Sequence, residues 1–113
     1  MPRANRLTRS RDFDAVYRRG RSTSTRYLVL YWFAPEEGQP GSRLGIAIPR
    51  KAGGAVTRNL LKRRLREAWA QLPEPQGADY VVLARPGLAE AAEARGFDWL
   101  RERVAEVLGK AAA

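Results

Sequence analysis

The residues of this chain that could do chemistry are mainly cations, and the densest group of them falls in one predicted helix. Five basic residues lie between positions 58 and 66: Arg58, Lys62, Arg63, Arg64 and Arg66. At about 100° per residue, Lys62, Arg63 and Arg66 share one sector of the helix. Asn59 falls in the same sector, and Arg64 lies on the far side. Cations at this spacing repel one another unless an anion neutralises them, and Glu67 is the only carboxylate close in sequence. The pattern therefore favours a nucleic-acid-binding face over the alternative, a solvated helix face.

The positive charge is concentrated in the first two thirds of the chain. Of 113 residues, 21 are Lys or Arg and 12 are Asp or Glu, which leaves a net charge of +9. Residues 1–72 hold 16 basic and 5 acidic residues, a net +11, whereas residues 73–113 carry a net −2. Such an asymmetry indicates a surface that faces a polyanion. Eighteen of the basic residues are Arg, which suits bidentate contacts to RNA phosphates, although a GC-rich genome would produce the same bias.

The absence of two residue types excludes several catalytic mechanisms. The chain has no His and no Cys, so it offers neither an imidazole base nor a thiolate, as nucleophile or as zinc ligand. Two-metal hydrolysis of a phosphodiester usually needs several convergent carboxylates. Those outside the C-terminal part fall on three separated elements: Asp12, Asp14, Glu36, Glu37 and Glu67. We therefore predict that the protein has no catalytic residues of its own.

The elements that must position these residues predict one α+β domain, 1–113. Aromatic and branched runs predict strands at 27–33, 44–48 and 80–84, with the first two forming a hairpin. Residues 23–26 leave room for a further short strand. Apolar spacing, caps and Gly or Pro stops predict helices at 10–18, 55–72, 88–94 and 97–108. The expected architecture is a two-layer sandwich of a small mixed sheet and helices, with about 1–6 and 109–113 flexible.

Two of the helices have apolar stripes that predict their buried sides. In the helix at 55–72 the stripe comprises Leu61, Leu65, Ala68, Trp69 and Leu72, and Leu60 falls outside it, among the polar positions. Trp69 is therefore assigned to the core, and Trp32, in the strand predicted at 27–33, is assigned to the core as well. In the helix at 97–108, Glu102 and Glu106 lie on the outer side, which argues against an RNA face there.

No segment predicts a membrane span or a secretory signal. The longest apolar run, 27–35, is far shorter than the roughly 20 residues that span a bilayer. The N-terminus is basic but lacks the apolar stretch of a signal peptide. We expect a cytoplasmic protein that does not contact membranes.

An ordered set of motifs runs through most of the chain. Its main part is Gly53-x-Ala55-Val56-x-Arg58-Asn59-x-Leu61-Lys62-Arg63, followed by Arg66-Glu67. The flanking motifs are Asn5-Arg6-Leu7, Asp12-Phe13, Val16-Tyr17, Val29-Leu30-Tyr31 and the run 79–85. Over roughly residues 5–108 this ordered set resembles the bacterial ribonuclease P protein subunit. Two positions depart from it: Leu60 stands where the family usually has a basic residue, and Gly54 where Asn is common.

The resemblance implies a protein that works with a catalytic RNA. Together they would hydrolyse the phosphodiester that releases the 5′ leader of precursor tRNA, with Mg²⁺ held mainly by the RNA. No obligate protein partner is evident. The implied fold is a ribosomal-protein-like α+β sandwich in α-β-β-β-α-β-α order with a left-handed βαβ crossover, although general chain geometry favours a right-handed one. The alternative is a ribosomal or RNA-chaperone-type protein with no role in cleavage.

The resemblance also implies two separate RNA surfaces. The residues expected to face the catalytic RNA are Arg58, Asn59, Lys62, Arg63 and Arg66. Those expected to form a cleft for the single-stranded leader are Phe13, Tyr17, Val29, Tyr31, Arg50 and Lys51. Phe13 and Tyr17 are four apart on a helix, and Val29 and Tyr31 two apart on a strand, so each pair shares a side. Aromatic faces beside cations form a stacking platform that tolerates any sequence, whereas the alternative for these aromatics is ordinary core.

Overall fold

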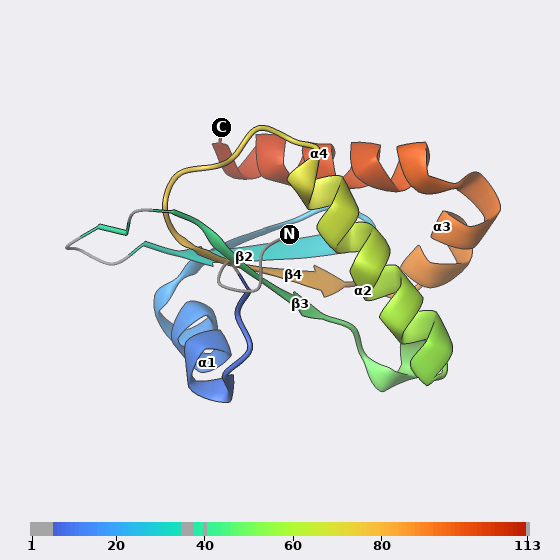
Figure 1. Ribbon diagram of the computed structural model, residues 1–113, viewed down its shortest axis with the longest axis horizontal. Coiled ribbons are helices and arrows are strands. Elements are labelled where there is room, and N and C mark those ends of the chain that lie inside the picture. The colour runs from blue at the N-terminus through green and yellow to red at the C-terminus, as the bar shows by residue number, and fades with distance from the viewer. Residues whose placement is uncertain (1–5, 35–37, 40, 113) are drawn as a thin grey trace.

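The computed structural model describes residues 6–34, 38–39 and 41–112 (Figure 1). The elements of the described residues are, in chain order, α1 (Ser10–Arg19), β1 (Arg21–Ser24), β2 (Leu28–Phe33), β3 (Arg43–Ala47), the short 3-10 helix η2 (Arg50–Ala52), α2 (Ala55–Ala70), β4 (Asp79–Ala84), α3 (Leu88–Arg95) and α4 (Phe97–Ala112). The predicted α+β class and order are confirmed. The additional short strand, expected at 23–26, begins two residues earlier. Residues 109–112, predicted to be flexible, are the last turn of α4, and residues 1–5 and 113 lie outside the described residues.

The predicted hairpin between residues 27–33 and 44–48 is wrong. The four strands are arranged in the order β1-β2-β4-β3, so β4 lies between β2 and β3. It pairs antiparallel with β2, Leu30 opposite Val82, and parallel with β3, Ile46 opposite Val82. All residues of β4 except Leu83 are buried. A strand that is apolar on both faces is stabilised most in the centre of the sheet, and this displaces the pairing of sequence neighbours.

The parallel strands β3 and β4 are joined through α2, and this crossover is left-handed. The side chain of Ala78 is buried against the layer that contains α2, and its carbonyl accepts a hydrogen bond from the N–H of Arg43 at 3.0 Å. Consider a strand of L-residues that runs upward and is viewed from the face toward which one residue's side chain points. The carbonyl of that residue then points to the right. Viewed from the α2 side with β4 running upward, β3 therefore lies to the right of β4 and α2 lies in front of the sheet. The hand implied by the family resemblance is confirmed, against the general right-handed preference.

Alternate strand residues face two different helical layers. On one face, α2, α3 and α4 cover the larger core, which includes Leu28, Leu30, Leu44, Tyr80 and Val82. On the other face α1 covers a smaller core around Leu7, Val16 and Val81 (Figure 1). A Cβ atom at Gly45 would overlap the ring of Phe13, so the glycine lets α1 sit directly on β3. Because α1 is small, part of this second face is left uncovered.

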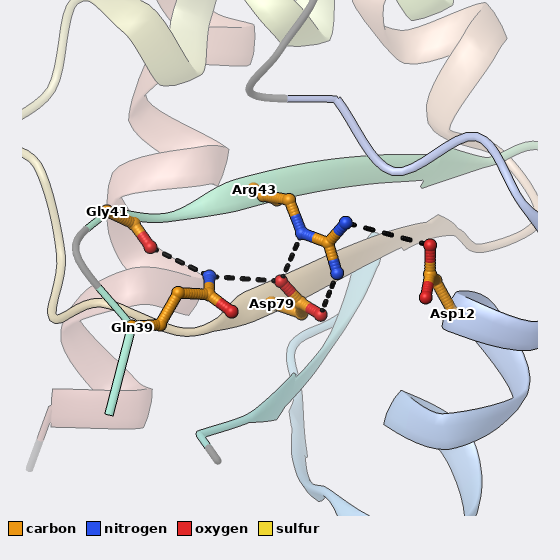
Figure 2. A network of polar contacts seen from close by, with 5 residues as sticks. All are labelled: Asp12, Gln39, Gly41, Arg43 and Asp79. Carbon is orange, nitrogen blue, oxygen red and sulfur yellow. Dashed lines mark hydrogen bonds and ion pairs between the residues drawn. The ribbon is translucent and has the colours of Figure 1, made fainter. Parts of the chain in front are cut away.

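A polar network holds the first residues of β3 and β4 to α1 (Figure 2). The Nε and Nη2 atoms of Arg43 donate to the two carboxylate oxygens of Asp79 at 2.8 and 2.7 Å. Gln39 Nε2 donates to the same carboxylate at 3.1 Å, and Arg43 Nη1 lies 3.6 Å from Asp12 Oδ2 on α1. The hydrogen bond to Asp79 is the main reason that the pKa of Arg43 is raised. The network therefore joins the edge strand β3, the central strand β4 and α1.

Replacing Asp79 by Asn tests how far the fold depends on this network. We expect the free energy of unfolding to fall by about 2–3 kcal/mol, because the substitution leaves the Arg43 cation without its main partner. Urea denaturation followed by circular dichroism measures the change. Asp98→Asn is the matched control, since that side chain is 84% exposed and forms an ion pair with the neighbouring Arg101 on the same helix. Equal stability of the two variants would contradict this assignment.

Candidate nucleic-acid interface

The helix α2 buries most of the apolar stripe that its sequence predicts and leaves the predicted cations at the surface. Leu61, Leu65, Ala68 and Trp69 are buried, whereas Leu72 is half-buried and lies beyond the end of the helix at Ala70. Of the residues predicted to face RNA, Asn59 and Arg63 are exposed, and Arg58, Lys62 and Arg66 are half-buried. No acidic side chain occupies the first turn of α2, and no side chain caps its N-terminus. The helix therefore presents positive side chains beside its own positive end.

The loop before α2 positions Arg58. Gly53 has φ 148°, a backbone conformation that L side chains rarely adopt, and its carbonyl accepts a hydrogen bond from Arg58 Nε at 3.2 Å. Gly54 forms the N-cap residue of the helix. The contact uses one of the five N–H donors of Arg58, so the others stay available to a phosphate.

Arg6 lies beside Arg66, although the two are 60 positions apart in the sequence. The N-terminal segment runs along β3, with a bridge between Arg6 and Leu44 and a hydrogen bond from the N–H of Leu7 to the carbonyl of Leu44 at 2.9 Å. Burial lowers the pKa of Arg66, and the charge of Arg6 lowers it further. Both Nε atoms are buried without a hydrogen-bond partner among the described residues. An anion placed there would relieve the repulsion and satisfy these donors.

Arg6 is the functional candidate that the spacing on α2 could not reveal. The only sequence signal for it is its place in the triplet Asn5-Arg6-Leu7 of the family resemblance.

Leu60 lies outside the buried stripe of α2, as the helical projection predicts. It is half-buried and lines a hollow of about 200 Å³ between α2 and α3, together with Ala89, Ala92 and Arg64. Leu60 therefore contributes to the contact between the two helices. Arg64 projects into the same hollow, away from Lys62 and Arg63, as the sequence predicts.

The aromatic residues predicted to bind a single strand gather on the opposite face of the sheet. The rings of Phe13 and Tyr17 have their centres 6.4 Å apart, and Tyr17 meets Tyr31 of β2 edge-on at 4.9 Å. Tyr17 is 41% exposed, so its ring is available at the surface. Burial raises the pKa of its hydroxyl, and Tyr31 and Asp14 raise it further, so Tyr17 is neutral at physiological pH. The helix and strand pairings predicted for these residues are confirmed.

A hollow of about 470 Å³ extends this face beyond α1. It is lined by Val29, Leu83, Pro49, Lys51 and Arg85, among others. Val29 and Leu83 are partners in the register of β2 and β4, so both point to the same side as Tyr31. Arg50 and Lys51 are exposed on η2. Sequence reasoning did not reveal Leu83 and Arg85, because they join the site only through the pairing of β2 with β4.

The described residues contain no group of three or more His, Cys, Asp or Glu side chains that could hold a metal ion. In the same part of the chain, no helix is long and apolar enough to cross a membrane.

The fold and the two surfaces define a small basic α+β protein suited to binding a polyanion, with a cationic helix on one face of the sheet and an aromatic cleft on the other. The model of the family described as ribonuclease P matches residues 1–112. The chain belongs to this family, and the resemblance found in the sequence is confirmed.

The similarity to known relatives extends over most of their length. The chain is 39% identical over 113 residues to the ribonuclease P protein component of Brevibacillus brevis, which covers 98% of this chain and 86% of that protein. The structure of the RNase P protein from Thermotoga maritima superposes with a TM-score of 0.83 at 36% identity, covering 93% of this chain and 96% of that one. The Staphylococcus aureus RNase P protein gives a TM-score of 0.81 at 30% identity, with 96% of each chain covered.

Replacing Arg66 by Met tests the repulsion between Arg6 and Arg66. We expect the melting temperature of the free protein to rise by about 2 °C at low salt, because one of two desolvated like charges is removed. The gain should shrink as salt is raised from about 20 to about 200 mM, since ions screen the wild-type repulsion. Differential scanning calorimetry measures both. Arg63→Met, at an exposed position, is the control; an equal gain there would assign the effect to net charge alone.

Proposed function

We propose that this protein is the RNA-binding subunit of ribonuclease P and assists endonucleolytic removal of the 5′ leader from precursor tRNA. The observation that carries the proposal is the separation of two surfaces, the cations of α2 and the aromatic group of Tyr17 and Tyr31, on opposite faces of one sheet. Two such surfaces allow one small protein to hold two RNA segments at once. The motifs that support the family also contain these residues.

The α2 face binds the catalytic RNA. Arg58, Lys62, Arg63 and Arg66 contact phosphates, and Asn59 adds a hydrogen-bonding side chain in the same sector. Contacts of this kind position an RNA without reading its sequence, and each neutralised phosphate steepens the dependence of affinity on salt. The Arg6 and Arg66 pair belongs to this face, because its buried Nε donors lack partners in the part of the chain that the structure describes.

The cleft on the other face binds the single-stranded leader. Phe13, Tyr17 and Tyr31 offer ring faces and edges, Val29 continues the apolar floor, and Arg50 and Lys51 supply charge for phosphates. Base stacking on aromatic rings contributes about 1–3 kcal/mol per base and is nearly independent of base identity. This tolerance suits leaders of varied sequence.

The chemical step belongs to the RNA. The RNA would hold most of the Mg²⁺, which would supply Lewis-acid chemistry at the phosphodiester, and the protein contributes binding and electrostatic screening. On this proposal the protein acts in the cytoplasm, its partners are the catalytic RNA and precursor tRNA, and none of its side chains is a catalytic residue.

Cleavage of precursor tRNA by the cognate RNA at low Mg²⁺ tests the whole proposal. We expect cleavage to be at least about tenfold faster with the protein, because its cations replace screening that Mg²⁺ otherwise provides. The stimulation should decrease as Mg²⁺ is raised. No stimulation at low Mg²⁺ would favour the alternative, a ribosomal or RNA-chaperone-type protein.

Alanine at Tyr17 or Tyr31 tests the leader cleft. We expect each substitution to weaken binding of precursor tRNA to the ribonucleoprotein by about five- to 100-fold, the loss of one stacked base, without changing the affinity for mature tRNA. Filter binding with both RNAs measures the two affinities on the same preparation. Mature tRNA thus serves as the control for folding and assembly. An equal loss for both RNAs would refute the cleft.

A further inference from the structure

A third concave surface lies at the edge of the sheet, apart from the α2 face and the leader cleft. It is a hollow of about 640 Å³ between the turn that joins β1 to β2 and the helix α4. Four cations and two aromatic residues contribute to its lining: Arg26, Arg95, Arg103, Lys110, Tyr27 and Trp99. None of them belongs to the motifs of the family resemblance or to the surfaces described above.

The aromatic rings of this hollow are stacked with cations. Tyr27 and Trp99 meet edge-on, with their ring centres 5.1 Å apart. The guanidinium carbons of Arg103 and Arg95 lie 5.4 and 5.8 Å from the centre of the Trp99 ring, and that of Arg26 lies 5.2 Å from the Tyr27 ring. Tyr27 and Trp99 are both only half-buried. Planar guanidinium groups and half-exposed rings are the surfaces on which nucleobases stack.

The charge of the hollow is unbalanced. Glu106 is the only carboxylate in its lining. Residues 73–113 carry a net −2, yet three of the five cations in that part of the chain, Arg95, Arg103 and Lys110, gather here. A general excess of basic residues does not explain this local concentration.

Arg103 and Lys110 have donors available for a ligand. Arg103 Nε is buried with no hydrogen-bond partner among the described residues, and Nη2 lies 3.8 Å from the exposed Glu102 carboxylate. Lys110 Nζ donates to the carbonyl of Ser24 at 2.7 Å, which uses one of its three hydrogens. A phosphate between these two side chains would accept the unused donors.

We propose that this hollow binds an unpaired RNA nucleotide, with the base stacked in the group formed by Tyr27, Trp99 and their guanidinium partners and the phosphate held by Arg103 and Lys110. It is a third RNA contact, at a helix that the sequence predicts to be an unlikely RNA face because of its acidic residues. Although Glu102 and Glu106 lie on α4, four cations surround the ring pair of Tyr27 and Trp99. The site does not depend on the leader cleft, so each can fail without the other.

The indole N–H resonance of Trp99 in the full-length, isotope-labelled protein tests the proposal, and Trp99→Phe assigns it. Octauridylate, an unstructured single strand, is the probe. We expect the resonance to shift and saturate, and inorganic phosphate at the same phosphate concentration to shift it far less. A Trp99 resonance that stays in place while the Tyr31 amide moves would overturn this site and leave the leader cleft intact. A polyglutamate peptide that shifts Trp99 as strongly as the RNA would overturn the nucleotide assignment in favour of an acidic protein partner.

Charge-matched variants give a second measurement. We expect the double substitution Arg95→Gln and Arg103→Gln to weaken octauridylate binding at Trp99 by about tenfold or more. The double substitution Arg64→Gln and Arg101→Gln is the control, because it removes the same charge at two positions outside the hollow. Arg64 lies on α2 and Arg101 pairs with Gln71 at 2.9 Å, so this control should change the affinity less than about twofold. Equal effects would show that only net charge matters and would overturn the site.

The assembled ribonucleoprotein then distinguishes the source of the nucleotide. If the double variant weakens binding only of precursors with long leaders, the hollow receives the leader beyond the cleft. If it weakens assembly with the catalytic RNA alone, the hollow receives an unpaired residue of that RNA. Unchanged affinities in both assays would overturn a role for the hollow in the ribonucleoprotein.

Discussion

The ion pair between Arg43 and Asp79 is the constraint on which the arrangement of this molecule depends. Asp79 is buried at the start of the central strand, and a buried carboxylate is tolerated only with a well-aligned cationic partner. Arg43 is its register partner on β3, so the two-pronged contact holds the parallel pairing at its first residues. Once β3 is beside β4, α2 must cross one face of the sheet, and Asp12 brings α1 onto the other. The ion pair thus holds the register in which α2 and the group of Tyr17 and Tyr31 lie on opposite faces of the sheet.

The cations on and beside α2 favour binding of an anion, and they do not favour the stability of the free protein. Arg6 and Arg66 lie close together, partly withdrawn from water, and their Nε atoms have no partner among the described residues. Fold stability alone would favour separating them or adding a carboxylate. Membership of the ribonuclease P family explains why this unfavourable repulsion is kept, because an RNA phosphate would neutralise both cations at once.

The aromatic residues divide into those that fill the core and those that remain half-exposed beside charge. Trp69 packs on Tyr80, with ring centres 5.3 Å apart, and both are buried between α2 and the sheet. The pair of Tyr17 and Tyr31 and that of Tyr27 and Trp99 have similar edge-on geometry, but neither pair is buried. Ring geometry therefore does not separate a core contact from a binding surface. What separates them is the remaining exposure together with the neighbouring cations.

Local periodicity in the sequence determined the helices, the buried stripe of α2 and the sector that carries Lys62 and Arg63, because residues three and four apart on a helix share a side whatever surrounds them. It also determined that Phe13 and Tyr17 share a side, and the ordered motifs determined the family. Only the tertiary structure decided that β4 separates β2 from β3, that Arg6 lies beside Arg66, and that Trp99 meets Tyr27. Each of these contacts joins segments tens of residues apart. Such a contact produces no regular pattern of residue spacing within either segment. Burial of β4, which is apolar on both faces, determined the strand pairing. That pairing then determined which side chains share a surface.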